Sequence, residues 1–217
     1  MKHLQPARTW SAPVVLFFSL LAGMAGAAQA PDEEVRQATD RLRTLIQQHH
    51  DEYKAKPDAF YKVVDREVVP HFDQQYIGQI VLGRYWRSAS EPQRRRFINA
   101  FKNALVHSYA DALLDNYNTV EATWKPVHAA PDATDATVDA ELTRQGAQPV
   151  QLGFSVRKVG DQWKVYDVIV DGVSLAANFR SQFSQEIKQN GLDSLIRRLE
   201  TGGKPLQDAS ALGKKKP

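Results

Sequence analysis

Ser174 is the residue whose setting most resembles that of a catalytic side chain. It lies in the segment GVSLA, residues 172–176, between an expected strand and an expected helix. This segment resembles the G-x-S-x-G turn that presents the nucleophile in α/β-hydrolases. However, Ala176 replaces the second glycine, the neighbouring strands are expected to be antiparallel, and the last histidine, His128, precedes the serine. We therefore expect Ser174 to cap the following helix.

The other acidic and basic candidates are isolated in the sequence. His71 and Asp73 could form an acid–base pair, but no partner motif accompanies them, so local hydrogen bonding is favoured. Asp167 shares a strand face with apolar residues, and a covered carboxylate there needs a partner, for which Arg180 is a candidate. A structural ion pair is favoured over catalysis by Asp167, because no complementary acid or base is evident.

The sequence predicts no metal site. Cysteine is absent, which excludes disulfides and thiolate ligands. His49 and His50 are adjacent on an expected helix, so their side chains diverge and cannot share a metal as an i, i+4 pair would. The arginines at positions 94–96 fan around a helix axis, which favours a solvated face over a site for phosphate or anionic headgroups.

The N-terminus has the layout of a secretory signal peptide. Lys2 and Arg8 precede the apolar run 14–23, which is followed by small residues. This run is shorter than the roughly 18 residues that a membrane-spanning helix needs. We therefore expect residues 1–30 to be removed and the remaining chain to work in the cell envelope, with the exact cleavage site left open.

The chain that remains is expected to form one domain, residues 31–204, followed by a flexible Lys-rich tail, residues 205–217. Removal of residues 1–30 takes away two positive charges and no acidic residue, so the formal net charge falls from +3 to +1. Three of the remaining positive charges lie together at positions 214–216. Because the body is close to neutral, nucleic acid is not expected as a partner.

Hydropathy patterns predict helices, then strands, then helices again. Ser90 and Gln93 form a capping box, and an apolar stripe from Phe97 to Leu113 makes the helix that follows the best defined in the sequence. The other helices are expected over residues 31–56, 58–69, 74–82, 174–189 and 193–200.

Beyond Asn118 the apolar period changes to two, which predicts strands over residues 119–125, 134–144, 149–159 and 162–170. The joins between them are short, which favours antiparallel pairing. The last strand is apolar on both faces, so an interior position is expected. The chain is therefore predicted to be an α+β domain, with helices packed around a four-stranded, mainly antiparallel twisted sheet.

Two separated segments carry unusual motifs. The first is IVLGRYWRSAS, residues 80–90, and the second is WKVYDV, residues 163–168, followed by GVSL. Together with GLDSLI at residues 191–196 they closely resemble the MlaC (toluene-tolerance) family of periplasmic phospholipid-binding proteins. The resemblance spans nearly the whole chain after the N-terminal segment.

The resemblance implies a periplasmic carrier that maintains outer-membrane lipid asymmetry. Such a carrier moves phospholipid between an outer-membrane lipoprotein–porin complex and an inner-membrane ABC transporter complex with an MCE-domain subunit. It needs no cofactor other than its phospholipid cargo. Two acyl chains expose on the order of 30 methylenes, so leaving them in water would cost about 24 kcal/mol, and a carrier must enclose them.

An apolar cavity between the helices and the sheet is therefore expected, with the headgroup toward solvent. Composition and periodicity do not separate residues that line a cavity from residues that fill a core. The expected lipid-contacting residues are Tyr76, Ile80, Val81, Leu82, Tyr85, Trp86, Phe97, Phe101, Leu105, Tyr109, Phe154, Tyr166, Val168, Val173, Leu175, Phe179 and Phe183.

Catalytic residues are not expected, and two alternatives to a carrier stay open. One is an envelope enzyme with a cone-shaped α+β pocket that acts on a small apolar substrate, with Asp167 or His71 as its base. The other is a structural envelope protein with a solid core.

Overall fold

A computed structural model describes residues 30–203 except 128 and 131. The predicted signal peptide, apart from Ala30, and the predicted tail lie outside the described residues. Within them, no helix is long and apolar enough to cross a membrane.

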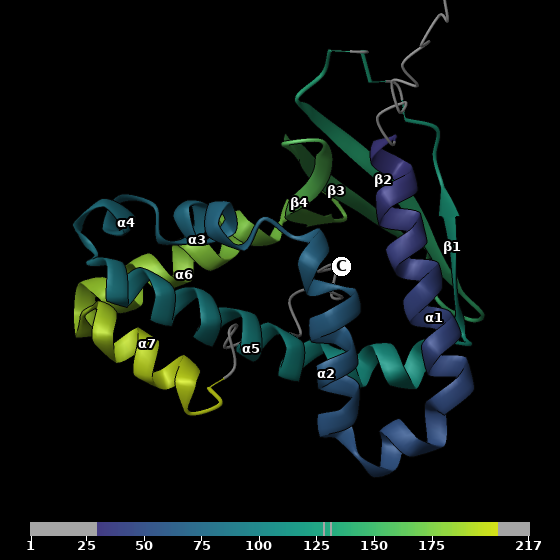
Figure 1. The fold of residues 1–217 in the computed structure, drawn as a ribbon, viewed down its shortest axis with the longest axis horizontal. Helices are drawn as coiled ribbons and strands as arrows, with labels where there is room; N and C mark the ends of the chain where they lie inside the picture. Colours follow the sequence, from purple (N-terminus) through teal and green to yellow (C-terminus); the bar gives the residue numbers. More distant parts are fainter. Residues whose placement is uncertain (1–29, 128, 131, 204–217) are drawn as a thin grey trace, which may run out of the picture.

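The helices match the predicted ones closely (Figure 1). They are α1 (Pro31–Ala55), α2 (Pro57–Glu67), α3 (Gln74–Leu82), α5 (Glu91–Asn116), α6 (Leu175–Asn190) and α7 (Leu192–Glu200). The α5 capping box is confirmed: the Ser90 side chain accepts a hydrogen bond from the Gln93 backbone, and the Gln93 side chain accepts one from the Ser90 backbone. The sequence did not predict the short helix α4 (Arg84–Ser88) or the 3-10 turn η1 (Val69–His71).

The strands form one antiparallel sheet in the order β1-β2-β3-β4-β5. The four predicted strands are β1 (Val120–Trp124), β2 (Asp135–Arg144), β3 (Val150–Val159) and β4 (Gln162–Val170). The fifth strand, β5 (Val173–Ser174), is too short to show a periodic pattern, so the prediction of four strands was one short. The interior position predicted for β4 is confirmed, because β4 lies between β3 and β5.

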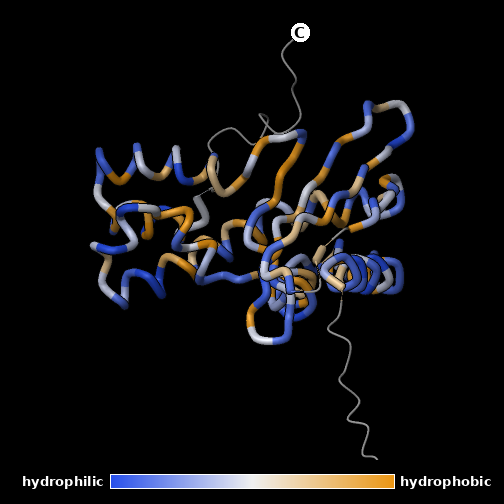
Figure 2. Tube along the Cα trace, turned by 90° about the horizontal axis from the view of Figure 1, so that it is seen from above, coloured by the Kyte–Doolittle hydropathy of each residue, from blue (hydrophilic) through white to orange (hydrophobic). Residues whose placement is uncertain are grey.

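The helices that gather around α6 and the layer formed by α1 and the sheet lie toward opposite ends of the domain (Figure 1). α1 packs against β2, whereas α3 and α6 pack against β4. Along the helices, hydrophobic and hydrophilic residues alternate in short runs, as amphipathic elements require (Figure 2). One face of each helix can therefore be buried while the other meets water.

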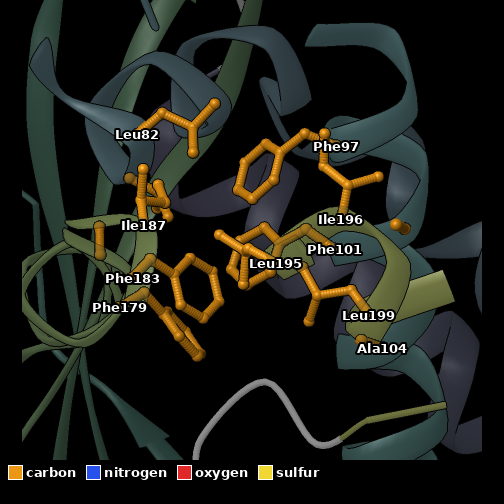
Figure 3. Close-up of a cluster of buried hydrophobic side chains, with 13 residues drawn as sticks. Leu82, Phe97, Phe101, Ala104, Phe179, Phe183, Ile187, Leu195, Ile196 and Leu199 are labelled. Carbon is orange, nitrogen blue, oxygen red and sulfur yellow. The ribbon is translucent and has the colours of Figure 1, made fainter. Parts of the chain in front are cut away.

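Among the described residues, the buried apolar side chains form three separate clusters. The helical cluster joins α3, α5, α6 and α7, and its side chains point toward one another in Figure 3. Four phenylalanines dominate it, with the Phe101 and Phe179 rings 4.9 Å apart and the Phe97 and Phe183 rings 6.0 Å apart, both edge to face. The second cluster joins α1, α2 and the C-terminal half of α5, and the third joins the start of α1 to the sheet.

Candidate functional site

An apolar cavity of about 390 Å³ lies where the three clusters meet. The helical cluster contributes Phe101 and Phe179, the α1–α2–α5 cluster contributes Val64 and Val106, and Val168 packs on the sheet cluster. The walls therefore come from elements far apart in the sequence. The lining residues are Val64, Val68, Val69, Phe72, Gln74, Ile77, Gly78, Val81, Ile98, Phe101, Lys102, Leu105, Val106, Tyr109, Ala110, Leu113, Tyr166, Asp167, Val168, Leu175, Ala176 and Phe179.

One side of the cavity reaches the surface along α5. Leu113 lines the cavity and is nevertheless 46% exposed. Lys102 also lines it, and its ammonium group forms an ion pair of 2.8 Å with Asp65 of α2. A ligand with an apolar part and a polar end could place the apolar part inside and leave the polar end near this charged edge.

The few polar groups of the lining are mostly engaged by protein partners. Asp167 accepts hydrogen bonds from the Ser174 hydroxyl and, at 2.9 Å, from the Ala176 backbone N–H. Burial raises the pKa of Tyr166, and a hydrogen bond from Ser155 opposes that rise. The interior of the cavity is therefore suited to hydrocarbon rather than to polar ligands.

Some of the residues expected to contact lipid do line the cavity, and their lipid contact remains a prediction. The cavity-lining members of that set are Val81, Phe101, Leu105, Tyr109, Tyr166, Val168, Leu175 and Phe179. They include the stripe on α5 with i, i+4 spacing, which periodicity identifies well.

The other members of the expected set lie elsewhere. Leu82, Phe97 and Phe183 are fully buried in the helical cluster, and Ile80, Tyr85 and Trp86 pack against it. Tyr76 lies under the Arg157 guanidinium, 4.2 Å from the ring centre, Phe154 packs on the sheet cluster and Val173 is 52% exposed. Periodicity identifies an apolar face but does not show whether the space beside that face is filled.

Other lining residues were not in the expected set. Ile98 belongs to the same helical stripe as Leu105, so its spacing could have identified it. Val69 and Phe72 come from a turn without periodicity, and they reach the cavity because Phe72 forms a bridge with Val165 of β4. No local pattern in the sequence predicts that contact.

Ser174 has the structural role predicted for it. Its hydroxyl accepts a hydrogen bond from the Ala177 N–H at 3.0 Å, which caps α6. The expected pairing of Asp167 with Arg180 is wrong, because the carboxylate is bound to Ser174 and to the first turn of α6. Arg180 instead lies against Gly83, where an added Cβ would be 2.8 Å from Arg180 Nε. Gly83 has a φ of 52°, a conformation that favours glycine.

The remaining acid–base candidates are engaged separately. His71 Nδ1 is 2.8 Å from Glu34 of α1, whereas Asp73 caps α3 and forms an ion pair of 3.3 Å with Arg157. His71 and Asp73 thus have separate partners. The bond between Asp73 and the Tyr76 N–H is local, as predicted, whereas the prediction of a local partner for His71 is wrong, because Glu34 lies 37 residues away in the sequence. In the described part of the chain, no group of three or more His, Asp or Glu residues is arranged to hold a metal.

The arginines of the first turns of α5 also have individual partners. Arg94 donates to the Trp86 carbonyl at 2.9 Å, Arg95 pairs with Glu91, and Arg96 donates to both carboxylate oxygens of Glu200. Their side chains thus bind to different elements and do not converge on a single anion site.

An α+β domain that surrounds an apolar cavity is typical of a protein that binds an apolar ligand. The sequence matches the MlaC protein family over residues 36–201. The chain therefore belongs to the MlaC family.

Individual relatives agree with this assignment. The toluene tolerance protein ttg2D of Pseudomonas putida is 32% identical over 168 residues, which are 77% of each chain. The intermembrane phospholipid transport system binding protein MlaC of Haemophilus influenzae is 28% identical over 189 residues, which are 86% of this chain and 88% of that protein.

A solved structure has the same fold. It is a phospholipid-binding protein from Ralstonia solanacearum in complex with a phospholipid, with a TM-score of 0.73 and 29% sequence identity. The match covers 86% of this chain and 100% of that one.

Proposed function

We propose that this protein binds a phospholipid through its acyl chains in the apolar cavity and carries it between the outer and inner membranes. The observation that carries the proposal is the cavity itself, which is lined by apolar side chains from three clusters. The phospholipid in the similar Ralstonia structure and the name of the Haemophilus relative support it.

The cavity-lining residues are the proposed acyl-chain contacts. If a methylene group fills about the volume of a liquid water molecule, roughly 30 Å³, a cavity of about 390 Å³ holds roughly a dozen methylenes. A phospholipid with two chains then requires the cavity to widen. The junction of three separate clusters is suited to this, because the clusters can move apart while each keeps its own internal packing.

The compartment and the partners are part of the same proposal. Residues 1–30 would direct secretion and be removed, residues 31–204 would act as the carrier domain in the periplasm, and residues 205–217 would form a flexible tail. The carrier would exchange cargo with an outer-membrane lipoprotein–porin complex and an inner-membrane MCE-domain ABC transporter complex, and would maintain lipid asymmetry without catalysing a reaction. The name of the Haemophilus relative, an intermembrane transport binding protein, supports this route.

Lipid extraction and native mass spectrometry of the purified protein test the proposal. We expect phospholipid to co-purify with the wild type, and Leu105→Trp, which fills the cavity, to retain about tenfold less. Ala112→Trp is the matched control, because Ala112 is exposed on the same helix. A folded wild-type protein that holds no lipid and takes none from phospholipid vesicles would refute the proposal.

A further inference from the structure

Tyr109 contributes the most unusual polar group of the cavity. It lies in the middle of the α5 stripe formed by Leu105, Tyr109 and Leu113, whose members are four residues apart and all line the cavity. Its hydroxyl is buried and has no hydrogen-bond partner among the residues that the structure describes. Buried tyrosine hydroxyls usually have a partner, so this one requires an explanation.

Its side chain also borders a second hollow on the other side of α5. That hollow is more polar and is lined by Asn103, His107 and the end of α7, including Glu200. The Tyr109 hydroxyl is nevertheless shielded from this polar hollow, because its oxygen is not accessible to solvent. Solvent therefore does not replace the missing hydrogen-bond partner.

The other ionisable groups of the lining already have partners. Lys102 pairs with Asp65, Asp167 binds Ser174, and Tyr166 has its hydrogen bond with Ser155. Burial raises the pKa of Tyr109 above its ordinary value of 10.0, so the hydroxyl keeps its proton at neutral pH and remains a donor. The wall of the cavity thus holds a covered hydrogen-bond donor that the described residues leave unused.

A trapped water molecule is a poor partner for this donor. An ordered buried water needs two to four polar partners, and the lining close to Tyr109 along α5 consists of Leu105, Val106, Ala110 and Leu113. A phospholipid, by contrast, carries ester carbonyls between its headgroup and its acyl chains. These carbonyls lose their water when the chains enter an apolar cavity, so they need a donor as much as Tyr109 needs an acceptor.

We propose that Tyr109 donates a hydrogen bond to an ester carbonyl of the bound phospholipid and so holds the lipid at a defined depth. The inference rests on the proposed function. In the present structure neighbouring atoms cover the hydroxyl, so the widening that a second acyl chain requires must also uncover it. Tyr109 is then a contact for the glycerol-ester region, between Leu105, which contacts hydrocarbon, and Leu113 at the exposed edge of the cavity.

Competition between two lipids tests this inference. The protein, stripped of lipid, is incubated with vesicles that hold equal amounts of a diacyl phosphatidylethanolamine and its dialkyl ether analogue, which lacks the carbonyls. The retained lipids are measured by mass spectrometry. We expect the wild type to prefer the diacyl lipid by up to about tenfold, the value of one buried hydrogen bond, and Tyr109→Phe to retain both lipids almost equally.

Tyr61→Phe is the matched control, because Tyr61 does not line the cavity and its hydroxyl already donates to Asp111 at 3.3 Å. This variant should keep the wild-type preference. A wild type that takes up both lipids equally, or a Tyr109→Phe variant with an unchanged preference, would overturn the inference while leaving the proposed function intact. A wild type that takes up neither lipid would refute the proposed function itself.

Thermal unfolding provides a second readout. Without lipid, Tyr109→Phe should be at least as stable as the wild type, because the substitution removes an unsatisfied buried hydroxyl. With diacyl lipid bound, the variant should gain less stability from the ligand than the wild type does. An equal loss of stability in both states would show a purely structural role and contradict the inference.

Discussion

Asp167→Asn separates the carrier from the enzyme alternative, because the two assign opposite roles to this carboxylate. In the structure, Asp167 Oδ2 accepts the Ser174 hydroxyl hydrogen bond and Oδ1 accepts the Ala176 N–H at the start of α6. Asparagine can keep one of these bonds but replaces the other oxygen by an NH₂ group, which cannot accept. It also removes a negative charge from the positive end of the helix dipole.

The size of the effect follows from these two losses. A hydrogen bond to a charged group contributes about 1.5 to 3 kcal/mol, and a charge at a helix terminus about 0.3 to 1 kcal/mol. Partial exposure of Asp167 favours the lower ends of these ranges, so we expect Asp167→Asn to lose about 2 kcal/mol of unfolding free energy. For a domain of this size, that corresponds to a Tm lower by roughly 4 to 8 °C.

Differential scanning calorimetry and lipid retention are measured on the same samples. We expect the Tm of Asp167→Asn to fall while the amount of retained lipid stays within about twofold of the wild-type amount, because the cavity wall keeps its shape. Ser174→Ala should be destabilising too, and the double variant should lose less than the sum, because the two residues share one hydrogen bond. Asp161→Asn, an exposed aspartate in the β3–β4 turn, is the charge-matched control and should leave the Tm unchanged.

A different pattern would refute the reasoning. If Asp167→Asn left the Tm unchanged and abolished turnover of an apolar ester or amide substrate, Asp167 would be a catalytic base. If the single losses of Asp167→Asn and Ser174→Ala added fully, the hydrogen bond between them would not be the source of the stability.

Two further predictions concern packing and charge. Phe97→Ala should lower the unfolding free energy by about 3 to 5 kcal/mol, because Phe97 is fully buried. Leu105→Ala should lower it by only about 1 to 2 kcal/mol, because Leu105 borders open space. Urea titrations measure both losses, and similar losses would show that the cavity is filled by side chains. The Arg96 guanidinium lowers the pKa of Glu200 below its ordinary value of 4.5, so this pair stabilises the fold above about pH 4.5 and loses its effect as the pH falls through the lowered pKa. Carboxyl titration by NMR should show the pKa of Glu200 returning toward 4.5 in Arg96→Ala; an unchanged pKa would exclude the pairing.

Local features of the sequence account for most of the secondary structure. The period-two segments predicted β4 with its observed bounds and the other strands to within one residue at each end. The Ser90 and Gln93 capping box located the start of α5 because both of its hydrogen bonds join residues three apart. β5 and α4 were not predicted, because each is too short to repeat a hydropathy pattern. They form only where β4 and α3 place their residues.

The hydrogen-bond partners of Asp167 depended on the path of the chain between β4 and α6. The sequence showed that a helix begins after Ser174. It did not show whether Asp167 binds Arg180 or the backbone of α6. Either an ion pair or a helix cap can supply the hydrogen bonds that a carboxylate needs, so the residue types alone do not distinguish them. The turn between β4 and α6 places Ser174 and the Ala176 N–H against Asp167, so the helix cap forms.

The sequence by itself determined the α+β class, the helices and main strands, the apolar stripe of α5 and, through two distinctive motifs, the family. Only the tertiary structure decided which apolar residues face open space, because Phe97 and Leu105 lie on the same helix, and one is packed in a cluster while the other lines the cavity. The physical reason is that hydropathy records the preference of a side chain for leaving water, whereas a cavity arises where clusters from distant segments meet without filling the space between them.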